Sequence, residues 1–148
     1  MKNRTQRVIT IAMLLLILLI GCKKSYNTPG TNNNNVPSVT NGTWTITSYT
    51  QRTENKTGDF SGINFTFSSD GKVVASGAYS ASGSWSSTPA STDYYGNSTV
   101  ASFTINLGSS SPFNKLSKSW NIGEQATTVL RLDNKETTED EHITFSKN

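Results

Sequence analysis

The chain has 148 residues, with 13 Lys/Arg against 10 Asp/Glu, one histidine and one cysteine. Three of the bases lie within residues 1–21, and the remaining chain carries 10 bases against 10 acids; from Gly42 onward the balance is 8 against 10. Without a basic surface, nucleic-acid binding loses its electrostatic contribution.

The N-terminal segment has the composition of a secretory signal. Lys2, Arg4 and Arg7 precede the apolar run Val8–Ile20, in which Thr10 is the only polar residue. A comfortable transmembrane helix needs about 20 apolar residues, and this run is shorter. A basic start followed by an apolar run of this length predicts a signal peptide over residues 1–21.

The only cysteine, Cys22, follows the sequence Leu19-Ile20-Gly21. This stretch resembles the lipobox of bacterial lipoproteins. The resemblance implies cleavage before Cys22, a diacylglycerol on its thiol and acylation of the new N-terminus with a palmitate-type chain. The alternatives are a free thiol, half of a disulfide for which the chain has no second cysteine, and a short uncleaved anchor. Several acyl chains on one residue would hold the protein to a membrane firmly.

Lys23 follows the cysteine. A residue other than aspartate at this position resembles the pattern by which such lipoproteins are sorted to the outer membrane. The implied location is the cell envelope, with the periplasmic and surface faces both open. Residues 22–41 then form the lipidated cysteine and a tether, because Ser25–Asn41 is rich in Asn, Thr, Ser, Gly and Pro. A coil of that kind spans on the order of 25 Å.

Residues 42–148 form the predicted folded domain, in which apolar residues recur with a period of two. Ser69-Asp70-Gly71 between two such segments predicts a hairpin turn. In the first segment the alternation places Trp44 and Ile46 on one face and Tyr49 on the other. The predicted strands cover residues 43–49, 63–67, 72–80, 83–87, 101–107, 119–122, 128–132 and 142–146. About eight short strands joined by polar turns predict an all-β, antiparallel up-and-down meander that forms a small barrel.

Gly42-Thr43-Trp44 is similar to the G-x-W motif of lipocalins. The stretch Phe65–Gly71 followed by Gly83-Ser84-Trp85 resembles a pattern of small bacterial lipocalin-like lipoproteins. The resemblance implies a lipocalin-like barrel in which Arg131 packs beneath Trp44. The domain departs from that family because it is shorter, shows no C-terminal helix, and has Thr92-Asp93-Tyr94 in a predicted loop.

Catalytic and metal-binding patterns in the chain are weak. Ser69–Lys72 and Lys56–Gly58 match short motifs of penicillin-recognising enzymes, but their order and spacing do not fit that fold. His142 alternates with inward-facing Ile143 and is therefore predicted on the surface. The acidic run from Glu136 through Glu139, Asp140 and Glu141 lacks the spacing of a calcium loop and is interpreted as a solvated hairpin tip. The prediction is a protein that is not an enzyme and has no cofactor or metal.

Aromatic side chains dominate the predicted inward face and supply the candidate ligand-binding residues: Trp44, Phe65, Phe67, Trp85, Tyr94, Tyr95, Phe103 and Trp120. One hypothesis is a lipocalin-like carrier or sensor that binds a small hydrophobic ligand. The alternative is a structural or interaction module that docks a protein partner in the envelope. Whether the barrel interior is hollow or packed stays open at this stage.

The long polar loop predicted from Ser87 to Thr99 carries adjacent Tyr94 and Tyr95. At the mouth of a barrel these tyrosines would gate a ligand. On a projecting tip they would anchor a partner. An ordinary turn is the third interpretation.

Overall fold

The computed structural model describes residues 39–134, 136 and 138–148. This part of the chain consists of β-strands and two short 3-10 helices, η2 (Thr57–Phe60) and η3 (Phe113–Lys115). The strands are β1 (Trp44–Gln51), β2 (Glu54–Asn55), β3 (Ile63–Phe67), β4 (Lys72–Gly77), β5 (Ala81–Thr88), β6 (Ser91–Thr92), β7 (Ser98–Thr99), β8 (Ser102–Asn106), β9 (Ser119–Gln125), β10 (Val129–Asn134) and β11 (Glu141–Lys147).

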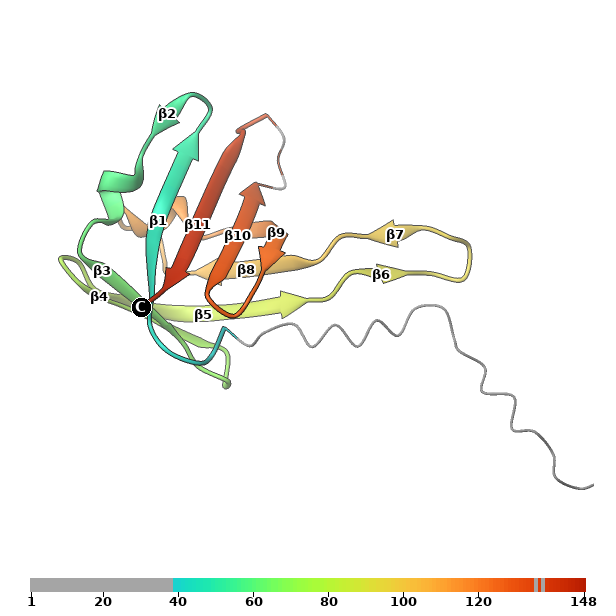
Figure 1. Cartoon of the computed structure of the whole chain (residues 1–148), viewed down its shortest axis with the longest axis horizontal. Helices are drawn as coiled ribbons and strands as arrows, with labels where there is room; N and C mark the ends of the chain where they lie inside the picture. The colour runs from blue at the N-terminus through green and yellow to red at the C-terminus, as the bar shows by residue number, and fades with distance from the viewer. Residues whose placement is uncertain (1–38, 135, 137) are drawn as a thin grey trace, which may run out of the picture. The chain divides into compact units, whose positions relative to one another are not determined.

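Eight of these strands close into an antiparallel barrel (Figure 1). They follow one another around it in the order β1-β3-β4-β5-β8-β9-β10-β11, and β11 pairs back with β1. The short strand β2 pairs with the last two residues of β1, Thr50 and Gln51, beyond the part of β1 that pairs with β3. The predicted eight-stranded up-and-down meander is therefore confirmed.

Alternation along the strands builds one apolar interior, as predicted. In β10, for example, Leu130 and Leu132 are buried while Arg131 between them is exposed. The predicted turn at Ser69-Asp70-Gly71 joins β3 to β4, and Gly71 has a φ of +83°. Glycine adopts that backbone conformation without the steric penalty that a side chain brings.

The prediction for Tyr49 is wrong, because β1 does not alternate regularly. The pairing of β1 with β11 shifts between Ile46 and Ser48, which is a β-bulge. A bulge adds one residue to one strand and reverses the facing of every side chain after it. Tyr49 is consequently fully buried and packs edge-on against Phe60, with 5.5 Å between ring centroids.

Short segments pack against both ends of the barrel. Where β1 begins, Val39 is buried, and its carbonyl accepts a 2.8 Å hydrogen bond from Trp44 Nε1. The core thus includes a residue from the segment predicted as tether. Where β1 ends, η2 and η3 contribute buried Phe60 and Phe113, and Lys115 Nζ lies 2.5 Å from Asp59 Oδ2 to join the two helices.

The predicted loop from Ser87 to Thr99 is instead part of a hairpin. Thr88 pairs with Ser102, and Ser91 pairs with Thr99 at the same register, so that β6 and β7 continue the ladder of β5 and β8. Figure 1 shows this hairpin extending away from the barrel. We call residues 86–100 the arm.

The predicted signal peptide (1–21), the lipidation of Cys22 and nearly all of the tether lie outside the described residues. A search of the described part of the chain identifies no helix with the length and apolar character needed to cross a membrane.

Candidate functional site

Five of the predicted ligand-binding residues lie deep in the barrel core. Their side chains are at most 1% exposed. Phe67 touches Phe103 and Phe145 edge-on, with ring centroids 5.5 and 5.9 Å apart. The five residues are Trp44, Phe65, Phe67, Phe103 and Trp120. Aromatic pairs in this geometry stabilise a core beyond their buried area, and these side chains therefore fill the interior in the structure.

Trp85 lies at the edge of this cluster, where β5 leaves the barrel to form the arm. Its ring is half-buried and stacks on Phe103 at 5.1 Å between centroids. Its Nε1 donates a 2.9 Å hydrogen bond to the carbonyl of Ser68. Trp85 thus fixes the base of the arm to the core.

Arg131 does not pack beneath Trp44, and this part of the lipocalin-based prediction is wrong. Its side chain is exposed on the outer face of β10, where its guanidinium pairs with Glu124. Trp44 is fully buried inside the barrel. The two residues therefore lie on opposite faces of the sheet, as the alternation around Arg131 requires.

The prediction that Glu141 belongs to a solvated hairpin tip is wrong. Glu141 is 2% exposed and lies at the start of β11. Its Oε1 accepts a 2.8 Å hydrogen bond from the Tyr49 hydroxyl. Its Oε2 accepts hydrogen bonds from Lys118 Nζ at 2.6 Å and from Asn134 Nδ2. Burial and the hydrogen bond to Glu141 raise the pKa of Tyr49 well above its ordinary value, and the phenol stays a donor.

This network was missed in the sequence because Glu141 lies beside three acidic or turn-forming neighbours. The signal was its position two residues before Ile143 and four before Phe145, which both point inward. A hollow of about 330 Å³ lies beside the network and is lined by Lys118, Ser119, Asn134, Glu136 and Glu139. Since the carboxylate of Glu141 is already bonded to three protein donors, the network is a structural element of the barrel end.

His142 lies on the outer face, as predicted, with both ring nitrogens next to carboxylates. Nδ1 is 2.5 Å from Asp133 Oδ1, and Nε2 is 3.0 Å from Asp140 Oδ1. The hydrogen bonds to Asp133 and then Asp140 raise the pKa of His142 above its ordinary value. Within the described residues, no group of three or more His, Cys, Asp or Glu side chains has the arrangement of a metal site.

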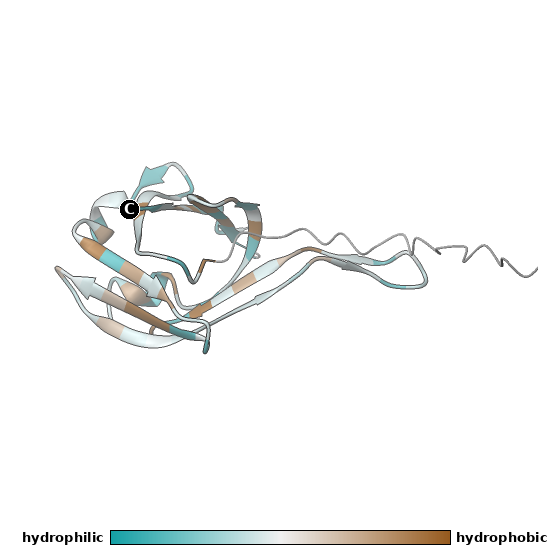
Figure 2. Cartoon of the chain, turned by 60° about the horizontal axis from the view of Figure 1, so that its bottom comes forward, coloured by the Kyte–Doolittle hydropathy of each residue, from teal (hydrophilic) through white to brown (hydrophobic). Residues whose placement is uncertain are grey.

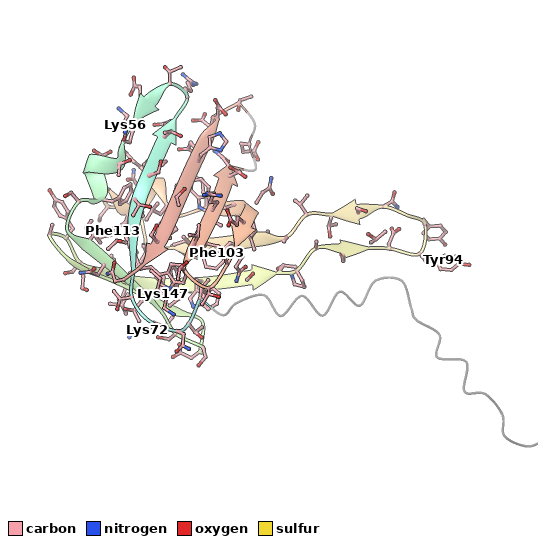
Figure 3. All side chains as sticks on the ribbon, in the orientation of Figure 1. Lys56, Lys72, Tyr94, Phe103, Phe113 and Lys147 are labelled. Carbon is pink, nitrogen blue, oxygen red and sulfur yellow. The ribbon has the colours of Figure 1, made fainter. Side chains whose placement is uncertain are left out.

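Tyr94 lies at the far end of the arm from Phe103 (Figure 3), and Tyr95 follows it in the chain. They are 97% and 86% exposed, more than any other large hydrophobic side chain of residues 39–134, 136 and 138–148. Their rings contact each other edge-on at 85°, with centroids 5.6 Å apart. The structure therefore does not bring these two candidates together with the other six, and it places them on a projecting tip.

A tight turn holds the tip. The N–H of Asp93 donates to the carbonyl of Asn97 at 2.9 Å, and the N–H of Gly96 donates to the carbonyl of Asp93 at 3.1 Å. Gly96 has a φ of +84°. This is a three-residue hairpin loop with the left-handed residue in the position that glycine favours. The two tyrosines occupy the central positions of the turn.

Both carboxylate oxygens of Asp93 accept hydrogen bonds within this turn. Oδ1 accepts from the backbone N–H of Tyr95 and of Asn97, and Oδ2 accepts from Asn97 Nδ2. The hydrogen bonds from Asn97 lower the pKa of Asp93. The sequence signal for this geometry was the run Asp-Tyr-Tyr-Gly-Asn, in which Asp opens the turn and Gly closes it.

The rest of the arm is uncharged. Asp93 is the only charged residue between Lys72 and Lys115. All residues from 86 to 100 are exposed, and most are Ser, Thr, Ala or Tyr. In Figure 2 the strongly apolar colour lies mainly on the barrel strands, whereas the outer part of the arm is pale to hydrophilic.

Comparison of the chain with protein-family models, with curated proteins and with solved structures finds no match. The candidate functional site is therefore defined by geometry alone: a projecting arm whose single charged residue is Asp93 and whose tip carries two exposed tyrosines.

Proposed function

We propose that the protein is a non-enzymatic, lipid-anchored interaction module of the cell envelope, in which the barrel presents the arm to a protein partner. The exposed tip is the observation that carries this proposal. Tyrosines 97% and 86% exposed, on a turn held by three hydrogen bonds to Asp93, form a preorganised contact surface. A surface that is already ordered loses little entropy when it binds.

The composition of the arm supports a protein as the partner. Tyr, Ser, Gly and Asn dominate the loops with which antibodies bind proteins, because tyrosine supplies rigid contact area and the small polar residues supply adaptable hydrogen bonds. The 85° angle between the Tyr94 and Tyr95 rings makes a wedge rather than a flat platform. A wedge of this kind fits a concave pocket in which both hydroxyls find acceptors.

The binding of a small hydrophobic ligand in the barrel is the other function that the fold allows. Five of the aromatic side chains that would line such a site are at most 1% exposed, and two of them, Phe67 and Phe103, contact each other in the core. A ligand there requires the core to open. Native mass spectrometry of the protein from its own host distinguishes the two functions, since a carrier releases a small apolar mass on unfolding and a docking module releases none.

The docking function predicts that the double variant Tyr94→Ala/Tyr95→Ala loses its partner. Loss of one buried tyrosine anchor weakens binding by about 2 kcal/mol, or about 30-fold in Kd. The measurement is chemical cross-linking of the full chain in host membranes, followed by quantitative mass spectrometry of the cross-linked proteins.

Tyr79→Ala is the matched control, because Tyr79 is also exposed, at 57%, but lies between β4 and β5 rather than on the arm. The partner is expected with the wild-type protein and with Tyr79→Ala, and not with the double variant. Equal recovery of every cross-linked protein from all three would refute the docking function of the tip.

The proposed anchor predicts that Cys22→Ser moves the protein from the membrane fraction to the soluble fraction. Serine cannot carry the thioether-linked lipid, and the acyl chains that hold the protein to the bilayer are then lost. Ser25→Ala, three residues further on, is expected to stay membrane-bound. Retention of Cys22→Ser in the membrane fraction would show that something other than this lipid holds the protein there.

A further inference from the structure

The arm carries a second feature besides its tip, namely a strand edge without a neighbour. β6 and β7 form a separate two-stranded sheet, and within the described residues neither pairs with another strand. Each strand therefore has one edge whose backbone N–H and C=O groups face outward. The first open edge belongs to β5 and β6. It begins after Trp85, where pairing with β4 ends, and runs to Thr92. The second open edge belongs to β7 and runs from Asn97 to Val100, where the chain reaches the pairing of β8 with β9.

The two edges are not equally protected. Proteins block exposed edges with charged side chains, with proline or with bulges. Pro89 interrupts the edge on the β5–β6 side because it has no backbone N–H. The edge at β7, Asn97–Val100, contains neither a charge nor a proline. It also carries Val100, an apolar side chain that is 63% exposed.

We infer that the β7 edge of the arm pairs with the same edge of a second copy of this chain, so that two arms form a four-stranded antiparallel sheet. Identical strands that meet antiparallel about a twofold axis are complementary to themselves, and both copies use one surface. Asp93 is the only charged residue on the arm, and an antiparallel pairing places the two Asp93 side chains at opposite ends of the sheet, which keeps the repulsion between them small.

The side chains of the arm also suit this contact. Ser91 Oγ and Thr99 Oγ1 lie 2.8 Å apart across the hairpin, and Thr92 Oγ1 and Ser98 Oγ lie 3.0 Å apart. Hydroxyls of Ser98 and Thr99 on one copy meet the same residue types on the other and bond in the same way. A two-stranded ribbon is marginally stable by itself, and two further strands stabilise it. The contact uses the backbone edge and leaves the tyrosine rings at the tips, and it does not rest on the docking function.

The test is the mass of the full chain in detergent, measured by native mass spectrometry over a range of protein concentrations. The wild-type protein is expected as a dimer. Val100→Lys is expected to weaken dimerisation at least tenfold, because it places a positive charge from each copy at the shared edge. Since Val100 is exposed, the variant is expected to keep its fold, which circular dichroism checks.

Two comparisons make the result specific. Ala90→Lys adds the same charge on the opposite, proline-interrupted side of the arm and is expected to leave the dimer intact. An equimolar mixture of Val100→Lys and Val100→Asp is expected to form a mixed dimer that is more stable than the dimer of either variant alone. A wild-type protein that stays monomeric, or equal weakening by Ala90→Lys and Val100→Lys, would overturn the inference.

The result of this dimerisation test does not depend on whether the tip docks a protein partner. Tyr94→Ala/Tyr95→Ala is expected to remain dimeric even where it loses its partner. A dimer lost in that variant but kept in Val100→Lys would place the contact at the tip and would equally overturn the edge as the interface.

Discussion

Phe67→Ala is expected to lower the free energy of unfolding by about 3–5 kcal/mol. Phe67 is fully buried, and its ring contacts Trp85, Phe103 and Phe145 at 5.5–5.9 Å between centroids. Removal of the ring takes away its own transfer free energy and leaves a cavity that three aromatic neighbours cannot easily close. A loss of this size is a large part of the 5–15 kcal/mol that stabilises a typical domain.

Urea denaturation followed by tryptophan fluorescence measures this loss, since Trp85 lies against the substituted ring. Phe67→Leu serves as the matched control, because leucine keeps most of the apolar volume, and its expected loss is about 1.5 kcal/mol. If Phe67→Ala unfolds at the same urea concentration as the wild-type protein, the interior is not packed around this ring. The carrier function would then gain support.

The second large loss of stability is expected for Glu141→Ala, which removes the acceptor of three hydrogen bonds. Tyr49, Lys118 and Asn134 all bond to the buried carboxylate of Glu141. Breaking a buried ion pair by removal of one partner costs about 3–5 kcal/mol, because the other partner stays behind without compensation. The side chain of Lys118 is 32% exposed and is partly solvated in the variant, which favours the lower end of that range.

Arg131→Ala provides the contrast. It also breaks an ion pair, with Glu124, but the side chains of that pair are 58% and 42% exposed. Exposed pairs contribute about 0–1 kcal/mol. Glu141→Gln keeps the size of the side chain and part of its hydrogen bonding. Its loss of unfolding free energy is expected to lie between those of Glu141→Ala and Arg131→Ala. Equal stability of Glu141→Ala and Arg131→Ala in the same urea titration would contradict a structural role for the Glu141 network.

Regular alternation made most of the fold predictable. In the segments around Phe65 and Leu130 every second residue is apolar, and turn residues separate the segments. Such a pattern favours a fold in which all apolar faces meet in one core, and the observed meander brings them together inside the barrel. The arm was predicted only as a polar loop. Its strands are polar on both faces, so its sequence does not alternate between apolar and polar residues as a half-buried strand does.

For the candidate site, the sequence singled out Tyr94 and Tyr95 but left open whether they gate the barrel or project from it. That choice depends on whether residues 87–99 fold back over the barrel or continue the β5–β8 ladder. The network around Glu141 brings together residues 92 positions apart, Tyr49 and Glu141, and depends on the bulge in β1. Local patterns carry no information on such a pair.

The sequence alone determined the eight strands of the barrel and most of their inward faces, because these depend on the two-residue period of a strand. Closure of the barrel decided the rest. It turned Tyr49 inward and buried Glu141 beside Lys118, and among the described strands it left none beside the outer part of the arm. These features arise from the register between strands distant in sequence, and the free energy of packing the whole core selects that register.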